Sequence, residues 1–306
     1  QCMMRQANKV ESFKYSLAAH DSLHAKYNTA TGLEVVADDA WGHLQVDATS
    51  IYLLLLAQVT AGGRRIIVTQ AEVDFVQNLI YYISRAYRIR DFGIWERGNK
   101  INNGKTEVNA SSVGMAKAAL TALDGLNLFG LDGPASAVVH TIADAIARAE
   151  ATLQTLLPRE SRSKECDSAL LSVIGFPAFA VDDKKLIQRT RDEIRSKLEG
   201  RYGCKRFLLD GHQSVLEDQS RMYYEHAELS GFENIESEWP LFFTYLYISA
   251  NFSGDKELAL FYRTKLEQLM VEKDGFMLLP ELYYVPADGI AAEKEHPGSQ
   301  KRVAND

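Results

Sequence analysis

The chain has 306 residues, of which 46% are hydrophobic and 25% charged, with only 7 prolines. This composition is typical of a globular protein long enough for one large domain or two small ones. The net charge of -7 argues against a nucleic-acid-binding surface, which needs clustered lysines and arginines. No apolar run reaches the roughly 18 residues that a membrane helix needs. Three cysteines without C-x-x-C spacing argue against a disulfide framework or structural zinc, so we expect a reducing compartment.

Apolar residues at helical spacing, together with helix-ending residues, predict most of the elements. In chain order, helices are expected at residues 47–61, 69–88, 112–124, 134–157, 182–198, 238–251 and 255–272. Gly62 ends the first of these, and Pro158 stops the fourth. Thr69 followed by Glu72 is a capping-box pattern that opens the second. One short stretch, 206–209, reads as a strand.

Seven long helices joined by loops that carry aromatic and acidic residues predict an all-α fold of helices paired in layers. No short repeat is present, which favours a closed helical barrel over an open solenoid. The sequence shows no strong internal domain boundary. Residues 288–306 are polar and charged and include glycine and proline, so they are expected to form a linker or a disordered tail.

Two loops combine a glutamate with aromatic neighbours. The first places Trp95 beside Glu96 soon after a predicted helix, and the second, 278–284, surrounds Glu281 with aliphatic and aromatic residues. An aromatic wall desolvates a nearby carboxyl, as a general acid at neutral pH requires. Two carboxylates in clefts lined by aromatic residues are what a glycosidase needs for catalysis. The alternative is an ordinary structural role, because a glutamate beside a tryptophan is more often a solvated residue at a helix end.

Other chemical signals are weaker. His20 and His24 are spaced i, i+4, but the third ligand of a metal site is missing, so no metal site is expected. The tripeptide 91–93 matches the magnesium-binding Asp-Phe-Gly of protein kinases without the motifs that accompany it. No glycine-rich dinucleotide or phosphate fingerprint occurs, and no cofactor is expected.

Many segments resemble the alpha and beta regulatory subunits of phosphorylase kinase, and the resemblance runs nearly end to end. The segments that carry it are 9–15, 21–28, 41–47, 92–98, 109–117, 201–208, 232–236, 239–242 and 279–283. Residues 10–15 and 41–47 are more alpha-like, whereas 157–163 and 297–302 are more beta-like. The sequence therefore leaves open which of the two subunits it resembles more.

The resemblance implies a glucoamylase-like (α/α)6 toroid of twelve helices, present here as an incomplete domain over residues 1–287 that lacks the first helices and the closing helix. In the glucoamylase pattern, the position of Glu96 carries the general acid and that of Glu281 the catalytic base. Gln45 and Asp47 match a Gln-x-Asp that lines the cleft of the hydrolases. The substrate-binding residues expected on this basis are Trp41, Gln45, Asp47, Trp95 and Tyr283.

The function implied by the resemblance is that of a cytoplasmic regulatory and scaffolding subunit, not itself an enzyme, which controls the phosphorylation of glycogen phosphorylase. Its expected partners are the catalytic kinase subunit, calmodulin and the other regulatory subunit, with glycogen or a malto-oligosaccharide as a further ligand and no nucleic acid. A C-terminal lipid anchor of family members would lie outside this chain. The alternative is an inverting glycoside hydrolase, or a vestigial oligosaccharide-binding site, in the same toroid.

Ser161 and Ser163 are candidate regulatory phosphorylation sites, since they follow Pro158 and so lie beyond a helix end. A phosphate there would add a charge of about -1.5 to -2 and could pair with the neighbouring arginines. The alternative is an ordinary solvated loop.

Overall fold

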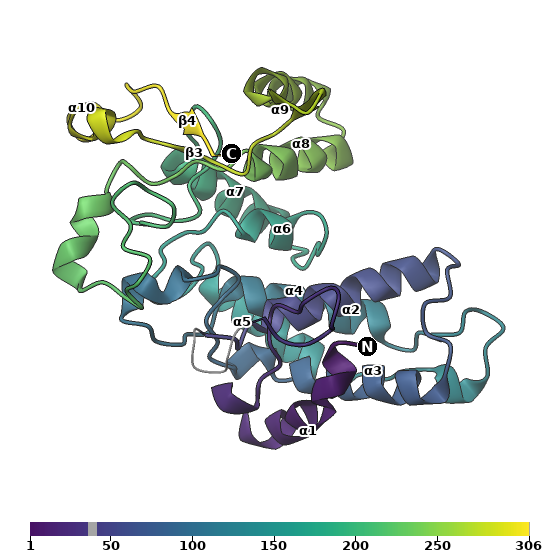
Figure 1. The fold of residues 1–306 in the computed structure, drawn as a ribbon. Helices are drawn as coiled ribbons and strands as arrows, with labels where there is room; N and C mark the ends of the chain where they lie inside the picture. Colours follow the sequence, from purple (N-terminus) through teal and green to yellow (C-terminus); the bar gives the residue numbers. More distant parts are fainter. Residues whose placement is uncertain (36–41, 306) are drawn as a thin grey trace. The chain divides into compact units, whose positions relative to one another are not determined.

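The computed structural model describes residues 1–35 and 42–305, which form two compact units. Unit 1 comprises Gln1–Arg97 and Lys105–Leu156, and unit 2 comprises Gly98–Gly104 and Leu157–Asp306. Helices predominate in both units (Figure 1), and the strands among the described residues form two small two-stranded sheets. The predicted all-α class is therefore confirmed.

The described residues of unit 1 form five α-helices and several short 3-10 turns. They are α1 (Ala7–Ser16), α2 (Val46–Ala61), α3 (Gln70–Ile83), α4 (Ala110–Leu123) and α5 (Ala145–Leu156), with 3-10 turns η1 (Met3–Gln6), η2 (Ala19–Asp21), η3 (Ala86–Arg88) and η5 (Ala135–Ala137). α4 is rich in small residues and is buried along nearly its whole length. Small side chains let helices approach closely, and α4 packs against both α2 and α5.

The capping box predicted at the start of α3 is present. The Thr69 hydroxyl accepts a hydrogen bond from the Glu72 amide at 3.3 Å, and the Glu72 carboxylate accepts one from the Thr69 amide at 2.9 Å. The helix ends at Ile83 instead of near residue 88. The Ser84 hydroxyl bonds back to the Ile80 carbonyl at 2.7 Å, and the chain continues into the separate turn η3.

Unit 2 contains four α-helices, a small helix near its end and both sheets. The elements are η4 (Gly98–Asn102), α6 (Leu170–Ile174), α7 (Lys184–Leu198), η6 (His226–Phe232), α8 (Leu241–Ser253), α9 (Lys256–Leu269), β1 (Val271–Lys273), β2 (Phe276–Leu278), β3 (Tyr283–Tyr284), η7 (Ala287–Gly289), α10 (Ile290–Glu295) and β4 (Val303–Ala304). α8 and α9 lie side by side (Figure 1) and pack together. Side chains of Asp183 and Asp255 cap α7 and α9.

The single helix predicted over 134–157 is wrong in its first part. Pro134 is extended (φ -64°, ψ 156°), and regular helix begins only at Ala145. Between them, the Val139 amide bonds to the Leu126 carbonyl at 3.0 Å and the His140 amide to the Gln77 side chain at 2.9 Å. These contacts with distant residues hold 138–140 extended after the turn η5, which no local pattern reveals.

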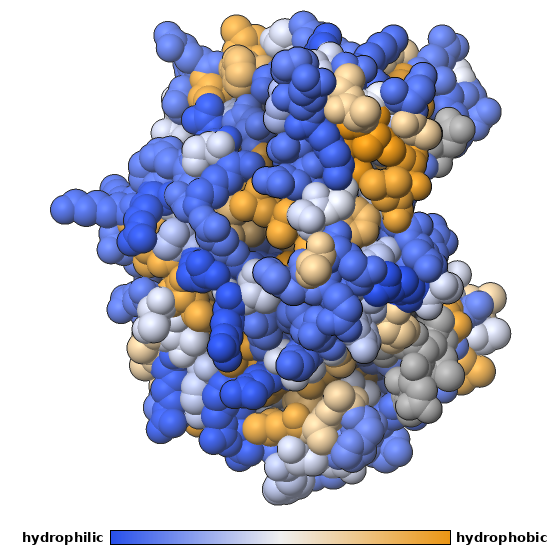
Figure 2. All heavy atoms as spheres, turned by 90° about the vertical axis from the view of Figure 1, so that its left-hand side faces the viewer, coloured by the Kyte–Doolittle hydropathy of each residue, from blue (hydrophilic) through white to orange (hydrophobic). Residues whose placement is uncertain are grey.

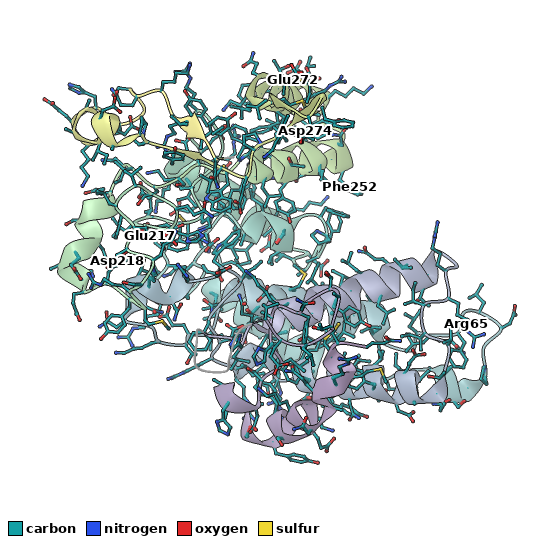
Figure 3. All side chains as sticks on the ribbon, in the orientation of Figure 1. Arg65, Glu217, Asp218, Phe252, Glu272 and Asp274 are labelled. Carbon is teal, nitrogen blue, oxygen red and sulfur yellow. The ribbon has the colours of Figure 1, made fainter. Side chains whose placement is uncertain are left out.

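The helix predicted to residue 272 ends at Leu269 because a hairpin follows it. β1 and β2 pair antiparallel around Asp274 and Gly275, which both have positive φ, as an Asp-Gly hairpin turn requires. Glu272 and Asp274 are exposed on this hairpin, where Figure 3 labels them.

Two further segments differ from the sequence prediction. Residues 206–209 form no strand. Leu209 has a left-handed φ of 64°, and Nε of Arg206 forms an ion pair with Oδ2 of Asp210 at 2.6 Å. The segment expected as a linker or disordered tail holds α10 and β4 instead, and β4 pairs with β3. Arg302, which is 4% exposed, fixes this segment through buried ion pairs.

The described helices include none that is both long and apolar enough to cross a membrane. The face shown in Figure 2 is mostly hydrophilic, with hydrophobic side chains gathered in separate patches.

Candidate functional site

The loop that carries Trp95 and Glu96 is held by the start of α2. The Phe92 amide bonds to the Leu44 carbonyl at 2.9 Å, and the Gln45 side-chain amide donates to the Gly93 carbonyl at 2.7 Å. Gln45, predicted to line a sugar cleft, is thus engaged with the backbone of this loop.

Asp91 is the centre of the hydrogen bonds beneath the loop. Its carboxylate, 1% exposed, accepts from the Ser112 hydroxyl at 2.6 Å, the Asn109 amide group at 2.7 Å, the Val46 amide at 3.0 Å and the Gly93 amide at 3.2 Å. Burial raises the pKa of Asp91, and these neutral donors oppose the rise. One carboxylate therefore joins the loop to the starts of α2 and α4.

Asp47 lies in the first turn of α2 and is 6% exposed. Burial raises its pKa to about 7, and the negative charge of Asp91 adds to the rise. Within the part of the chain that the structure describes, Oδ1 of Asp47 has no hydrogen-bond partner. Unit 1 thus contains two buried carboxylates whose pKa values are both raised by burial.

Glu96 is partly exposed and forms an ion pair with Lys26. A general acid must carry a transferable proton, whereas here a lysine ammonium occupies the carboxylate. Trp95 beside it is half-buried. The proposed roles of both residues remain predictions, and Trp41 lies outside the described residues.

Glu281 belongs to unit 2, where it is exposed between β2 and β3, and its Oε2 accepts from the Asn305 side chain at 3.3 Å. Tyr283 is buried, its hydroxyl donates to the Leu269 carbonyl at 2.6 Å, and its ring lies 4.9 Å from that of Tyr202. The Tyr283 hydroxyl is thus engaged within unit 2. Since Glu96 belongs to unit 1, the expected separation of roughly 6.5 to 9.5 Å between the two glutamates stays a prediction.

The two candidate phosphorylation sites differ in access. Ser161 is 1% exposed, its amide bonds to the Lys164 carbonyl at 3.2 Å, and its hydroxyl accepts from the Lys164 amide at 3.3 Å. Ser163 is exposed. A kinase must reach the hydroxyl, so the folded chain offers Ser163 more readily than Ser161.

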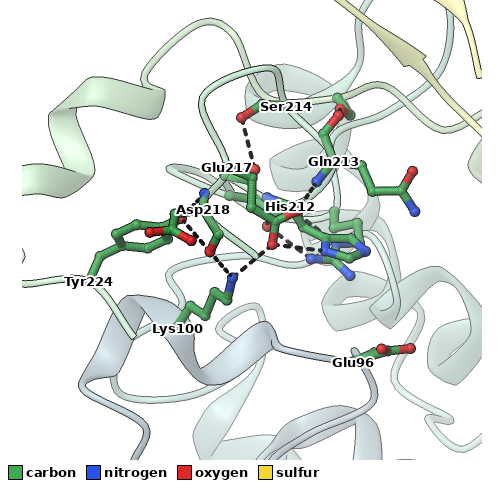
Figure 4. Close-up of polar contacts among 12 residues, drawn as sticks. Glu96, Lys100, His212, Gln213, Ser214, Glu217, Asp218 and Tyr224 are labelled. Carbon is green, nitrogen blue, oxygen red and sulfur yellow. Dashed lines mark hydrogen bonds and ion pairs between the residues drawn. The ribbon is translucent and has the colours of Figure 1, made fainter. Parts of the chain in front are cut away.

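Unit 2 contains a buried ionic cluster that no sequence pattern indicated (Figure 4). Lys100 bonds to Glu217 at 2.8 Å and to the Asp218 carbonyl at 3.0 Å. Glu217 also accepts from the Gln213 amide at 2.7 Å, and His212 lies 3.5 Å away. Burial opposes ionisation, but the neighbouring His212 and the hydrogen bond from Lys100 prevail and lower the pKa of Glu217 to about 2. The cluster fastens residues 98–104, which directly follow the Glu96 loop, to the rest of unit 2.

A second ionic cluster surrounds Arg302. Its guanidinium lies 3.1 Å from Glu238 and 3.4 Å from Glu293, and all three side chains are buried. Burial raises the pKa of Glu238, and the positive charge of Arg302 opposes that rise. The polar residues at 288–306 do not reveal this cluster, because Glu238 comes from a distant segment of the chain.

The buried rings of His24 and His43 stack with centroids 4.0 Å apart. Residues 1–35 and 42–305 contain no group of three or more His, Cys, Asp or Glu side chains that could hold a metal ion.

Both the sequence and the fold of this chain are similar to those of known proteins. The model of glycosyl hydrolases family 15 matches residues 1–306. The skeletal muscle phosphorylase b kinase regulatory subunit alpha of Oryctolagus cuniculus is 58% identical over 99% of this chain and 24% of its own length. A probable phosphorylase b kinase regulatory subunit alpha of Drosophila melanogaster is 56% identical over 98% of this chain and 24% of its own length. The chain thus spans about a quarter of the length of these relatives.

A solved structure described as "Glycosidase Wild Type" superimposes with a TM-score of 0.61 at 16% identity, covering 97% of this chain and 74% of the other. Similarity at that identity shows the fold, and it confirms the predicted glucoamylase-like architecture. The resemblance to phosphorylase kinase regulatory subunits is likewise confirmed by the two alpha subunits above. Because the family model spans all 306 residues, the chain belongs to glycosyl hydrolases family 15.

Proposed function

We propose that this chain is the glucoamylase-like part of a phosphorylase kinase regulatory alpha subunit and that its role is regulatory and scaffolding. The observation that carries the proposal is the 58% identity over 99% of the chain to such a subunit. The relatives reported above are alpha subunits, which favours alpha over beta.

In this role the subunit assembles in the cytoplasm with the catalytic kinase subunit, calmodulin and the other regulatory subunit, and it controls phosphorylation of glycogen phosphorylase. The subunit itself needs no catalytic site for this. The ion pair between Lys26 and Glu96 supports a non-catalytic role, since it occupies the carboxylate in the general-acid position.

The test is co-expression of the tagged full-length subunit with those three partners. We expect all four to co-purify at a fixed ratio and to phosphorylate glycogen phosphorylase in a calcium-dependent way. A preparation without the kinase subunit is the control and should have no such activity. Purification of the tagged subunit alone, with the partners left behind, would refute the proposal.

A second function is favoured by the two glutamates that match the glucoamylase pattern, Glu96 and Glu281. As an inverting hydrolase, the full-length subunit would release glucose slowly from a malto-oligosaccharide, with Glu96 as general acid and Glu281 as base. Calorimetry with maltotetraose tests binding, and Glu96→Gln should abolish glucose release while leaving binding in place. Absence of both binding and release removes this second function and leaves the regulatory role intact.

Phosphorylation of the loop after Pro158 is a further part of the regulatory proposal, with Ser163 preferred over Ser161 because it is exposed. Phosphosite mapping of the native complex under activating conditions should find phosphate on Ser163. Finding both serines always unmodified removes the idea.

A further inference from the structure

Unit 1 has a small surface pocket with a volume of about 280 Å³. Its walls include two arginines, Arg88 and Arg90, the hydroxyl-bearing Thr106, and the apolar Leu17 and Leu44. It combines positive charge with a partly apolar lining, a combination suited to an organic anion.

The local backbone explains why both arginines border the same pocket. η3 ends at Arg88, and Ile89 is extended (φ -70°, ψ 131°) and 3% exposed. In extended chain, side chains two residues apart project to the same side, opposite to the one between them. Burial of Ile89 therefore turns Arg88 and Arg90 together toward the surface, and both are exposed.

The guanidinium groups of Arg88 and Arg90 do not stabilise the described part of the fold through polar contacts. Arg88 and Arg90 make no side-chain hydrogen bond or ion pair with the residues that the structure describes. Other arginines of unit 1 do: Arg85 donates to the Lys14 carbonyl at 3.1 Å, and Arg148 pairs with Asp144 at 2.6 Å. The pocket thus brings together two cations, separated by one residue, in a chain of net charge -7.

The acids closest in sequence to the pocket residues have other partners. Asp91 directs its carboxylate to Ser112 and Asn109, and Asp21, in the turn η2 that contributes to the pocket wall, accepts from the Ser16 hydroxyl at 2.6 Å. Glu107, which follows Thr106, likewise has a partner of its own. Within residues 1–35 and 42–305, the positive charge of the pocket is thus left for a ligand.

We propose that the Arg88–Arg90 pocket binds a small phosphomonoester. A guanidinium presents a planar fork of donors that matches phosphate oxygens, and two such forks supply a charge of +2. A phosphomonoester carries about -1.5 to -2 at neutral pH and three acceptor oxygens. The Thr106 hydroxyl adds a neutral donor, and Leu17 and Leu44 cover the organic group. The pocket lies at the low end of the size range of small-molecule sites, which limits the ligand to a compact one.

Phosphate is favoured over carboxylate by charge. One guanidinium fork satisfies a single carboxylate, whereas two forks with a hydroxyl match the three oxygens and the double charge of a phosphomonoester. The preference can be measured with probes that share one apolar ring: phenyl phosphate and benzoate, with inorganic phosphate as the ligand that lacks the ring.

The experiment is calorimetric titration of the chain with these three probes at low ionic strength in a buffer free of phosphate and carboxylate. We expect one saturable site, with phenyl phosphate bound more tightly than inorganic phosphate and benzoate bound most weakly. The double variant Arg88→Ala/Arg90→Ala should weaken phenyl phosphate binding at least about tenfold, since hydrogen bonds to charged groups contribute that much or more. Arg88→Lys/Arg90→Lys, which keeps the charge without the forks, should fall between the two.

Arg64→Ala is the matched control, because Arg64 is another exposed arginine of unit 1 and lies outside the pocket. It should leave the affinity unchanged, and circular dichroism should show all variants folded. The proposal is overturned by the absence of saturable binding, by benzoate binding as tightly as phenyl phosphate, or by Arg64→Ala weakening binding as much as the double variant.

Discussion

The two units compensate their buried carboxylates in opposite ways. In unit 1, Asp91 and Asp47 lie together and receive neutral donors, and burial raises the pKa of each. In unit 2, Lys100 lowers the pKa of Glu217 together with His212, and Arg302 stands between two buried glutamates. Lys100 thus favours the ionised form of Glu217, whereas burial with neutral donors shifts Asp47 and Asp91 toward the protonated form. Glu238 is an intermediate case, because burial raises its pKa and the charge of Arg302 opposes that rise.

This difference predicts opposite responses to mutation and pH. Loss of a cation in unit 2 leaves an uncompensated buried charge, which is among the most costly changes known in protein cores. Loss of a charge in unit 1 relieves repulsion between two carboxylates instead. The predictions below separate the two cases.

The largest effect is expected for Arg302→Met. This change leaves Glu238 and Glu293 buried without their cation and should lower the free energy of unfolding by about 3 to 5 kcal/mol. Urea denaturation followed by circular dichroism measures it. Lys301→Met, at the exposed neighbouring position, is the control and should change stability by less than about 0.5 kcal/mol. Equal effects of the two changes would show that the ion pairs of Arg302 with Glu238 and Glu293 do not stabilise the fold.

A loss of about 3 kcal/mol is expected for Lys100→Met, because only one carboxylate, Glu217, loses its cation. The pH dependence gives a second test. The pKa of Glu217 is about 2 in the folded chain, whereas its ordinary value is 4.5, so its contribution to stability is present above pH 4.5 and lost as pH falls toward 2. The acid limb of stability should therefore be shallower in Lys100→Met than in the parent. An unchanged acid limb would contradict the assigned ion pair.

Asp47→Asn should stabilise the chain. The pKa of Asp47 is about 7 in the folded chain, whereas its ordinary value is 3.8, so folding favours the protonated carboxyl and stability falls as pH rises from about 4 to 7. Asparagine removes that dependence. We expect a gain that is absent at pH 4, grows to about 1 to 3 kcal/mol by pH 7 and stays constant above it. Thermal melts at pH 4, 6 and 8 measure it, and destabilisation at pH 8 would contradict the buried pair.

The sequence predicted correctly those features that depend on residues within about one helical turn of each other. The Thr69–Glu72 capping box is the clearest case, and the small-residue helix α4 begins within two residues of its expected start. The fold class followed from helical periodicity and the family resemblance.

What the sequence did not reveal depends on contacts between distant segments. Asp91 was visible only as part of a kinase-like tripeptide, because its donors Ser112 and Asn109 come from α4 and its cap. The Lys100–Glu217 and Arg302–Glu238 ion pairs join residues more than fifty positions apart along the chain. Propensity and spacing carry no information about such partners.

The smallest effect is expected for Lys26→Met, which removes the cation paired with Glu96. This ion pair is exposed, with side-chain exposures of 52% and 34%, so solvent already screens both charges. Exposed pairs of this kind contribute about 0 to 1 kcal/mol, and we expect a change in that range by urea denaturation. Lys100→Met provides the comparison, since it removes the same type of side chain from a buried pair. If Lys26→Met and Lys100→Met lowered the free energy of unfolding by similar amounts, burial would not determine the cost of removing a cation. That result would contradict the contrast drawn here between exposed and buried ion pairs.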